Sequence, residues 1–240
     1  MSRLSRRELL TTTALGLLLA PGAARGATIK GVLPFIPGYA NPPPSAEPGA
    51  WRYFTAEEGA AVEALVDRLI PPDPETPGGK DVGCAVFIDR QLAGPYGSFE
   101  GLYVSGPFHD GTREQGPQSP VTPAQHYRQA LSELEKHCRS AFGGASFAQL
   151  PDARKDEIIM GLENGSLKIE GTQGFFDLLL KDTQQGFLAD PVYGGNRNMA
   201  AWKMIGFPGA RYDYREWVDR HNERYPLPPV GINQHPDWTK

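Results

Sequence analysis

The sequence contains few of the residues that build redox, metal or catalytic centres. Its two cysteines, Cys84 and Cys138, are too few for an iron–sulfur cluster or a four-cysteine zinc site. It has no haem-attachment C-x-x-C-H motif, no G-x-G-x-x-G loop, no P-loop and no H-E-x-x-H pair. A G-x-S-x-G nucleophile elbow is also missing. We therefore expect no metal site, no cofactor site and no catalytic residues in this chain.

The sequence also has no strong excess of one type of charge and no long apolar run. The formal net charge is −4, and no cluster of Lys and Arg suggests a phosphate-binding surface, which argues against nucleic acid. No apolar run approaches the roughly 20 residues that span a bilayer. The 240 residues suffice for one domain with a core of its own. Glycine and proline are abundant, with 28 and 23 residues, so we expect long loops that are functional or covered by a partner.

The first 27 residues have the pattern of an export signal. Ser-Arg-Arg-Glu-Leu-Leu at 5–10 precedes a mildly apolar run and then small residues. This order predicts a twin-arginine signal peptide over 1–27, with Arg6 and Arg7 as its determinants, and a periplasmic location. An ordinary Sec signal is the alternative, and whether the signal is cleaved stays open. Twin-arginine export usually serves a cofactor protein, so the signal could serve a partner.

The remaining chain predicts helices and no strands. Residues 28–54 are rich in proline, including three at 42–44, which predicts an extended arm. Thr55 and Glu58 form a capping-box pattern, and Thr122 precedes a proline at a helix start. Apolar spacing then favours helices over 55–70, 82–92, 122–141, 151–164 and 172–188, with a short one near 215–221. The sequence thus predicts an all-α, loop-rich single domain over 55–240 with no substantial sheet. The helix over 172–188, apolar on several faces, is expected in the core or under a partner.

Two stretches are candidate partner interfaces. The segment 190–214 is predicted to be a loop in which a glycine pair permits positive φ values and leaves backbone N–H groups free. Asp190 is expected to cap this turn with its carboxylate. The second stretch, 94–123, carries aromatic side chains that need a covering surface. In both cases, the alternative is packing onto the chain's own helices. The candidate interface residues are Asp190, Pro191, Tyr193, Gly194, Gly195, Asn196, Arg197, Trp202, Pro208, Gly209, Tyr212, Tyr96, Tyr103 and Phe108.

The cysteines and the acidic residues complete the survey. In an exported protein, Cys84 and Cys138 are a candidate disulfide worth roughly 4 kcal/mol on the chain-entropy model. The alternatives are two buried thiols or a bond to a partner subunit. The acidic side chains that could serve as acid or base are expected on helix surfaces, and Asp89 is expected to form a structural ion pair with Arg90. The acids considered are Asp89, Glu170, Asp182 and Asp190.

Several motifs carry a resemblance to a known family. Asp-Pro-Val-Tyr-Gly-Gly-Asn at 190–196, followed by Ala-Trp-Lys-Met-Ile-Gly-Phe-Pro-Gly at 201–209, resembles the signature of the gluconate 2-dehydrogenase subunit 3 family. The runs at 65–73 and 86–94 resemble the same family. The resemblance therefore extends over most of the chain after the predicted signal.

This resemblance implies a function in a larger complex. It implies a non-catalytic small (gamma) subunit of a periplasmic dehydrogenase, associated with the membrane only through that complex. The large subunit would bind FAD and be of the glucose-methanol-choline oxidoreductase type, and a multihaem cytochrome c subunit would carry haem c. This chain would stabilise the flavoprotein, help it retain FAD and supply the export signal. Gluconate is the favoured substrate, with 2-ketogluconate, fructose and glucose left open.

Two other functions remain open at this point. One is an export chaperone that leaves the complex after transport. The other is a free-standing periplasmic protein or enzyme that binds a sugar acid through the side chains of Tyr193, Asn196 and Arg197. A purified monomer that binds a sugar acid would support the second.

Overall fold

A computed structural model describes residues 49–102, 106–109, 111–112, 115–116, 118–211 and 213–232. Of the predicted features, Arg6, Arg7, Tyr103, Tyr212 and the signal peptide lie outside these ranges, as does the arm up to residue 48. The described residues all belong to one unit of the chain, residues 37–240.

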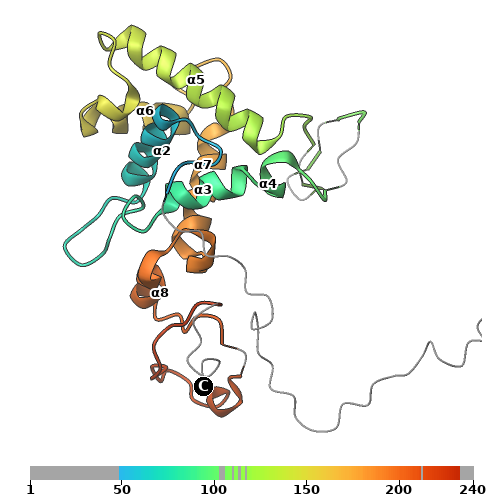
Figure 1. Ribbon diagram of the computed structural model, residues 1–240, viewed down its shortest axis with the longest axis vertical. Helices are drawn as coiled ribbons and strands as arrows, with labels where there is room; N and C mark the ends of the chain where they lie inside the picture. The colour runs from blue at the N-terminus through green and yellow to red at the C-terminus, as the bar shows by residue number, and fades with distance from the viewer. Residues whose placement is uncertain are drawn as a thin grey trace, which may run out of the picture. The chain divides into compact units, whose positions relative to one another are not determined.

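Helices make up the regular structure of this unit (Figure 1). The α-helices are α2 (Ala56–Leu69), α3 (Cys84–Leu92), α4 (Pro95–Ser98), α5 (Pro123–Ala141), α6 (Asp152–Glu163), α7 (Phe175–Leu188) and α8 (Ala200–Ile205). Short 3₁₀ turns are η2 (Phe147–Gln149), η3 (Pro191–Tyr193), η4 (Arg197–Met199) and η5 (Arg215–Trp217). Within the described ranges, the only β-type pairing is an isolated parallel bridge between Gly209 and Val230.

The predicted all-α fold is confirmed, with two corrections of detail. The predicted helix near 215–221 is only the 3₁₀ turn η5, and the segment 190–214 is not entirely a loop, because it contains η3, η4 and α8. Both capping residues act as expected. Thr55 Oγ1 accepts a hydrogen bond from Glu58 N at 3.2 Å, and the Glu58 carboxylate in turn accepts one from Thr55 N at 2.8 Å. Thr122 and Gln125 form the same pair at the start of α5. Such caps satisfy helix N–H groups that would otherwise lack partners.

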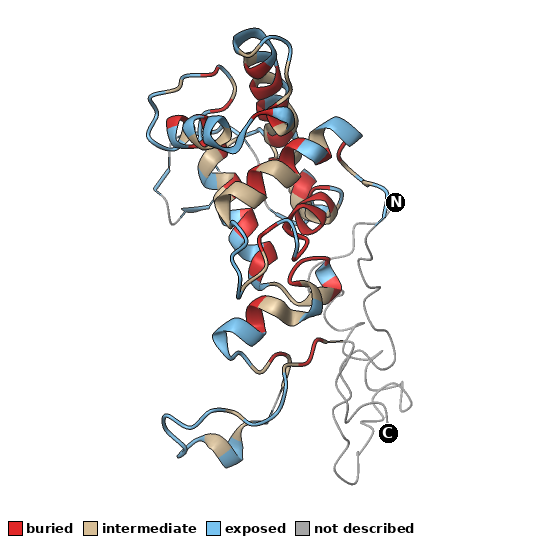
Figure 2. Cartoon of the chain, turned by 90° about the vertical axis from the view of Figure 1, so that its left-hand side faces the viewer, coloured by how far each residue is buried: buried red, intermediate tan, exposed pale blue. Residues whose placement is uncertain are grey.

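The core lies where α7 meets α2, α3, α5 and α6. Figure 2 shows buried residues along the inward sides of these helices. At its centre, the rings of Tyr127 and Phe175 meet edge to face with centroids 5.3 Å apart, and both residues are fully buried. The helix predicted over 172–188 therefore is a core element. No helix of the described part of the chain has the length and the apolar character needed to cross a membrane.

Asp89 is buried, contrary to the expectation that the acids lie on helix surfaces. Its carboxylate is 0% exposed and accepts backbone hydrogen bonds from Arg52 at 2.9 Å, Tyr53 at 2.9 Å and Phe54 at 3.0 Å. It also forms the expected ion pair with Arg90. Buried carboxylates need this number of donors, because desolvation otherwise penalises the charge. Residues 52–54, which the sequence assigns to the arm, are thereby fixed to α3.

The two cysteines are free and buried, so the candidate disulfide is not formed in the structure. Cys84 begins α3, and its thiol contacts the carbonyl of Thr183 on α7 at 3.6 Å. Cys138 lies in the last turns of α5. Burial raises the pKa of the Cys84 thiol to about 12 and that of Cys138 to about 11. Of the three alternatives, the structure has two buried thiols, which remain protonated and unreactive at neutral pH.

Candidate functional site

The segment after α7 begins with a turn that Asp190 holds in place. Asp190 Oδ1 accepts a hydrogen bond from Val192 N at 3.0 Å, so the predicted capping is confirmed. Pro191 occupies the first position of η3, where its missing N–H costs nothing. Gly194 then adopts φ 97°, a conformation that a residue with a side chain rarely takes. The turn thus reverses the chain directly at the end of α7.

The glycine pair in this turn serves close packing. A Cβ on Gly195 would lie 2.1 Å from the carbonyl oxygen of Gly186, in the last turn of α7. The carbonyl oxygen of Gly194 would lie 2.6 Å from a Cβ on Gly83, at the start of α3. Both glycines of the pair are buried. The turn is therefore wedged between α7 and α3, and neither glycine presents free backbone to a partner as the sequence predicted.

Asn196 connects the end of α7 to the start of α8. It is 0% exposed, and its Nδ2 donates to the carbonyl of Ala189 at 2.9 Å. Its Oδ1 accepts from the backbone N–H of Ala201 at 2.9 Å, inside the first turn of α8. Both polar ends of the amide are satisfied within the chain. The interpretation of Asn196 as a contact for a partner or a sugar hydroxyl is therefore corrected.

Trp202 fixes α8 to α7. It is only 5% exposed, and its indole Nε1 donates to the carbonyl of Leu188 at 2.8 Å. Its ring also meets Phe207 edge to face, with centroids 5.1 Å apart. Trp202 is thus mainly a scaffold residue, whereas the ring of Phe207 on its outer side is 44% exposed.

Large apolar side chains are exposed between the last residue of α7 and the turn that follows α8. Met204 and Ile205, at the end of α8, are 51% and 57% exposed. We call the set the α8 patch, and its members are Leu188, Tyr193, Met204, Ile205 and Phe207. Of the residues predicted as interface contacts, Tyr193 belongs to this patch. Exposed apolar side chains gathered in one segment are typical of a surface that another chain covers.

A C-terminal segment folds back onto this region. Ala210 N donates to Val230 O at 2.8 Å, and Arg211 donates to Pro228 O at 2.7 Å. Ile232 N donates to the second carboxylate oxygen of Asp190 at 2.8 Å. Gly209, predicted as an interface residue, is buried instead, and a Cβ there would lie 2.2 Å from Val230 O.

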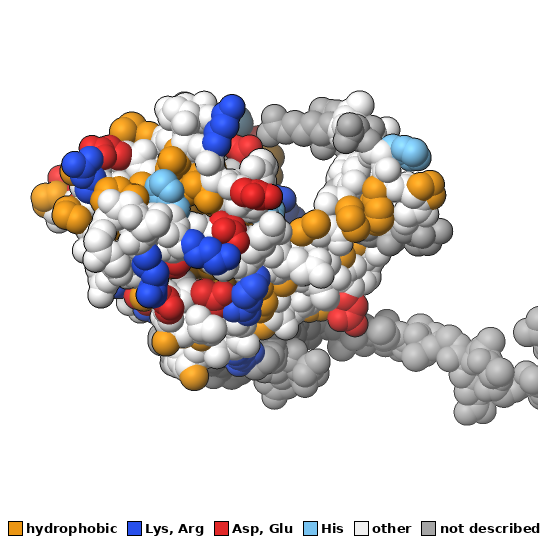
Figure 3. Space-filling model, turned by 90° about the horizontal axis from the view of Figure 1, so that it is seen from above, with side chains coloured by type: hydrophobic (Ala, Val, Ile, Leu, Met, Phe, Trp, Pro, Cys, Tyr) orange, Lys and Arg blue, Asp and Glu red, His pale blue; other side chains and the backbone are white. Residues whose placement is uncertain are grey.

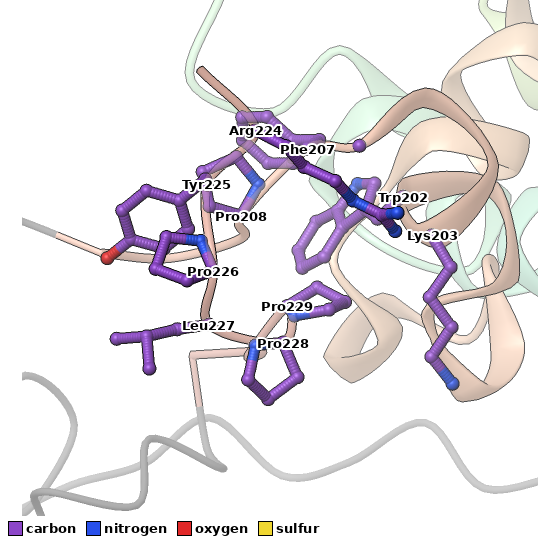
Figure 4. Close-up of a pocket in the computed structure, with 11 residues that line it drawn as sticks. Trp202, Lys203, Phe207, Pro208, Arg224, Tyr225, Pro226, Leu227, Pro228 and Pro229 are labelled. Atoms are coloured by element: carbon purple, nitrogen blue, oxygen red, sulfur yellow. The ribbon is translucent and has the colours of Figure 1, made fainter. Parts of the chain in front are cut away.

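An open groove separates α8 from this C-terminal segment (Figure 4). Its volume is about 380 Å³. One side is formed by Trp202, Phe207 and Pro208, and the other by the run 224–229, which contains three prolines. Lys203 and Arg224 also line the groove. Pro208 thus remains a candidate contact, through a groove that the sequence did not indicate.

The aromatic stretch 94–123 also contains one residue packed onto the chain's own helices, Tyr96, and one exposed residue, Phe108. The hydroxyl of Tyr96 donates to Asp182 at 2.9 Å, and that of Tyr127 donates to the same carboxylate at 3.0 Å. Tyr96 therefore folds back onto the chain's own helices, which was the alternative. Asp182 is 2% exposed, another departure from the expected surface position, and burial raises the pKa of its carboxyl group. Phe108 is 38% exposed and stays a candidate contact.

With this geometry established, comparison with known families assigns the chain. The family described as "Gluconate 2-dehydrogenase subunit 3" matches residues 56–209, more than half of the 240 residues. The chain belongs to this family. Searches of curated proteins and of solved structures found no match.

The family match covers the scaffold and the α8 patch together. It begins at the first residue of α2 and ends at Gly209, the residue that pairs with Val230. The match therefore includes the residues of helices α2 to α8 and of the turn 190–196. One wall of the groove, residues 224–229, lies beyond the match. In the described part of the chain, no three His, Cys, Asp or Glu side chains are grouped closely enough to hold a metal ion.

Sequence reasoning missed the residues that are exposed at the end of α8 and directly after it. Met204, Ile205 and Phe207 lie inside the run 201–209 that carried the family resemblance, so the segment was identified correctly. A helix of six residues is too short for apolar periodicity to separate its buried face from its exposed one. The signal that could have found them is their number, three large apolar side chains within four positions.

Proposed function

We propose that this chain is the non-catalytic small subunit of a periplasmic dehydrogenase and that it stabilises an FAD-bearing large subunit. The family supports membership of a gluconate dehydrogenase complex, because its description is that of a subunit. We take gluconate as the substrate of the complex for the same reason. The location, the partners and the non-catalytic role are parts of the proposal.

The distribution of exposed apolar side chains is the observation that carries this proposal. Seven of the eleven large hydrophobic side chains that are exposed in the described residues fall between 188 and 227. They are the α8 patch, Leu188, Tyr193, Met204, Ile205 and Phe207, together with Val218 and Leu227. Subunit interfaces gain most of their affinity from such side chains once these are removed from water. A surface of this kind is what a permanent subunit needs.

The opposite end of the unit has a different character. There α2, α5 and α6 are joined by ion pairs between their own side chains, such as Arg68 with Asp156 at 2.7 Å and Arg139 with Glu57. Figure 3 shows acidic and basic side chains interspersed on the face seen from above. Charges that pair within the chain keep a surface soluble and give a partner little to bind. We therefore place the partner at α8 and leave the α5 face in solvent.

The chemistry of the complex then belongs to the partners. Hydride transfer is a property of the flavin, which we place in the large subunit, and electrons would pass on to haem c in a multihaem cytochrome subunit. The role of this chain is to cover an apolar face of the flavoprotein and so help retain the FAD. The signal with Arg6 and Arg7 would export the assembled pair, and membrane association would arise only through the complex.

Purification of the tagged protein from envelope extracts of its host tests the proposal. We expect a stoichiometric protein with a flavin absorbance spectrum, identified by mass spectrometry, and acceptor-dependent oxidation of gluconate by the purified complex. Parallel assays with 2-ketogluconate, fructose and glucose identify the substrate. A colourless, well-folded monomer from the same extracts would reject the subunit function, and recovery of the flavoprotein without this chain would favour an export chaperone.

A further inference from the structure

We propose that the groove between α8 and the run 224–229 holds one protruding apolar side chain of the large subunit, with a carboxylate of that subunit beside it. This inference rests on the proposed function, because it specifies how the partner is recognised. It concerns a part of the surface that only partly overlaps the family match, since the run 224–229 lies beyond residue 209.

The groove is built before any partner arrives. On one side, the edge-to-face pair of Trp202 and Phe207 is held by the bond from the indole to Leu188. On the other side, the ring of Tyr225 meets that of Trp217 with centroids 5.1 Å apart. Arg211 donates to Pro228 O and lies over the Tyr225 ring at 5.4 Å, which fixes this wall. A preformed cavity lowers the ordering cost of binding.

The lining of the groove favours an apolar side chain over a sugar acid. The volume of about 380 Å³ has room for one large side chain together with a flanking residue. Four prolines line it, at 208, 226, 228 and 229, and proline has no backbone N–H to donate. The carbonyl of Pro228 is already occupied by Arg211. A sugar needs a hydrogen-bond partner for each buried hydroxyl, and the groove supplies few.

The charges at the groove indicate a carboxylate next to that side chain. Lys203 and Arg224 both line the groove and have no acidic partner among the described residues. Figure 4 shows the guanidinium of Arg224 extending toward Trp202, whereas the side chain of Lys203 runs away from that guanidinium. The nearest acid in sequence, Glu223, faces Arg220 at 3.9 Å. Two cations that have no acidic partner among the described residues, beside apolar walls, are complementary to an acidic residue that flanks an apolar one.

Zero-length carbodiimide cross-linking of the purified complex tests this assignment directly. The reagent joins an amine to a carboxylate only when the two are in contact, and mass spectrometry locates the linked residues. We expect Lys203 to be linked to an Asp or Glu of the flavoprotein. Lys136 on α5, which pairs with Glu133 at 2.7 Å, is the control amine. A link from Lys203 to Asp237 or Glu47 of the same chain, a link to a second copy, or no link above the Lys136 level would overturn the proposal.

Charge reversal provides a second readout. The double variant Lys203→Glu and Arg224→Glu is expected to reduce the flavoprotein recovered with the tagged chain by about tenfold or more. Lys136→Glu with Arg154→Glu is the matched control, because these exposed residues lie on α5 and α6. Thermal melts followed by circular dichroism check that both variants fold. If the wild-type chain recovers no flavoprotein, the proposed function fails. If wild type and the groove variant recover equal amounts, only the groove assignment fails.

Discussion

The segment that follows α7 has two halves with opposite purposes, the turn at 190–196 and the stretch at 200–209 that contains α8. In the first half, Gly194, Gly195 and Asn196 are buried, and both polar ends of the Asn196 side chain have partners, at Ala189 and at Ala201. In the second half, Met204, Ile205 and Phe207 each expose more than 40% of their surface. Both halves lie inside the family match. A glycine-rich motif beside aromatic residues suggested one recognition loop. The structure instead has a buried turn at 190–196, packed against α7, followed by exposed apolar side chains at 204–207.

This contrast shows that a glycine-rich motif can serve close packing instead of recognition. Glycine is required at 195 because the backbone of α7 leaves no room for a Cβ, which is a packing requirement. Binding energy at an interface comes from large side chains that become buried, and these belong to the second half. The two halves should therefore respond differently to substitution. Substitutions in the turn 190–196 should reduce folding stability. Substitutions in the α8 patch should reduce association with the proposed partner.

The largest expected effect is that of Gly195→Ala. The added methyl group would lie 2.1 Å from Gly186 O, so α7 and the turn must separate, at a cost of about 3 kcal/mol in the free energy of unfolding. Urea denaturation followed by circular dichroism measures it. Gly49→Ala is the control, because a Cβ there has no neighbour within 4 Å. Equal stability of the two variants would show that the turn is not wedged against α7.

Asn196→Ala should cost about 2 kcal/mol, because it leaves Ala189 O and Ala201 N without a partner inside the protein. Asn198→Ala is a matched control. Asn198 has a similar positive φ of 57°, against 45° for Asn196, but its side chain is exposed. The difference between the two variants in urea denaturation isolates the buried amide from the backbone strain. Equal free energies of unfolding for the two variants would show that the hydrogen bonds of Asn196 do not stabilise the fold.

Asp182, on the helix that carries both halves, supplies a pH test. Asp182→Ala should cost about 1.5 kcal/mol, since two tyrosine hydroxyls lose their acceptor while a buried carboxylate is removed. Because burial raises the pKa of Asp182, the folded state holds its proton above the ordinary Asp value of 3.8. The wild-type free energy of unfolding should therefore fall as pH rises from there through the raised pKa.

Asp182→Asn keeps an acceptor for a tyrosine hydroxyl and cannot ionise, so this fall with pH should be absent in it. Unfolding free energies of wild type and of Asp182→Asn, measured between pH 4 and pH 8, give the comparison. A constant difference between the two across that range would contradict the raised pKa.

Asp190→Ala should lower the free energy of unfolding by about 1 kcal/mol. The carboxylate accepts hydrogen bonds from the N–H groups of Val192 and Ile232, which are only partly buried, so water can replace the carboxylate. The specific expectation concerns hydrogen exchange. The amide of Ile232 should exchange faster in the variant, while amides in the middle of α5 keep their wild-type rates. Unchanged protection at Ile232 would show that Asp190 does not hold the C-terminal segment.

The smallest effect on stability, below about 0.5 kcal/mol, is expected for Met204→Ser, because this side chain is 51% exposed. Recovery of the flavoprotein with the tagged chain should nevertheless decrease. Met160→Ser on α6 is closely matched, at 54% exposure, and should leave recovery unchanged. Equal recovery with both variants would remove α8 from the interface.

The parts of the structure that the sequence predicted depend on nearby residues. The caps at Thr55, Thr122 and Asp190 bind groups two or three positions away, so a local pattern suffices. The positions of the buried acids were not predictable in this way. Asp89 binds Tyr53, 36 residues earlier, and Asp182 binds Tyr96, 86 residues earlier. Nothing in the local sequence distinguishes these acids from the surface acids around them. For the same reason, the groove, built from residues near 205 and 227, required the tertiary structure.

The carboxylate of Asp89 has a consequence for proteolytic processing. By binding the backbone of residues 52–54, it fixes the point at which the chain enters α2. A polypeptide cut anywhere before residue 49 keeps all three of these bonds and every helix from α2 to α8. A form that begins at residue 49 should therefore keep slow amide hydrogen exchange at residues 52–54.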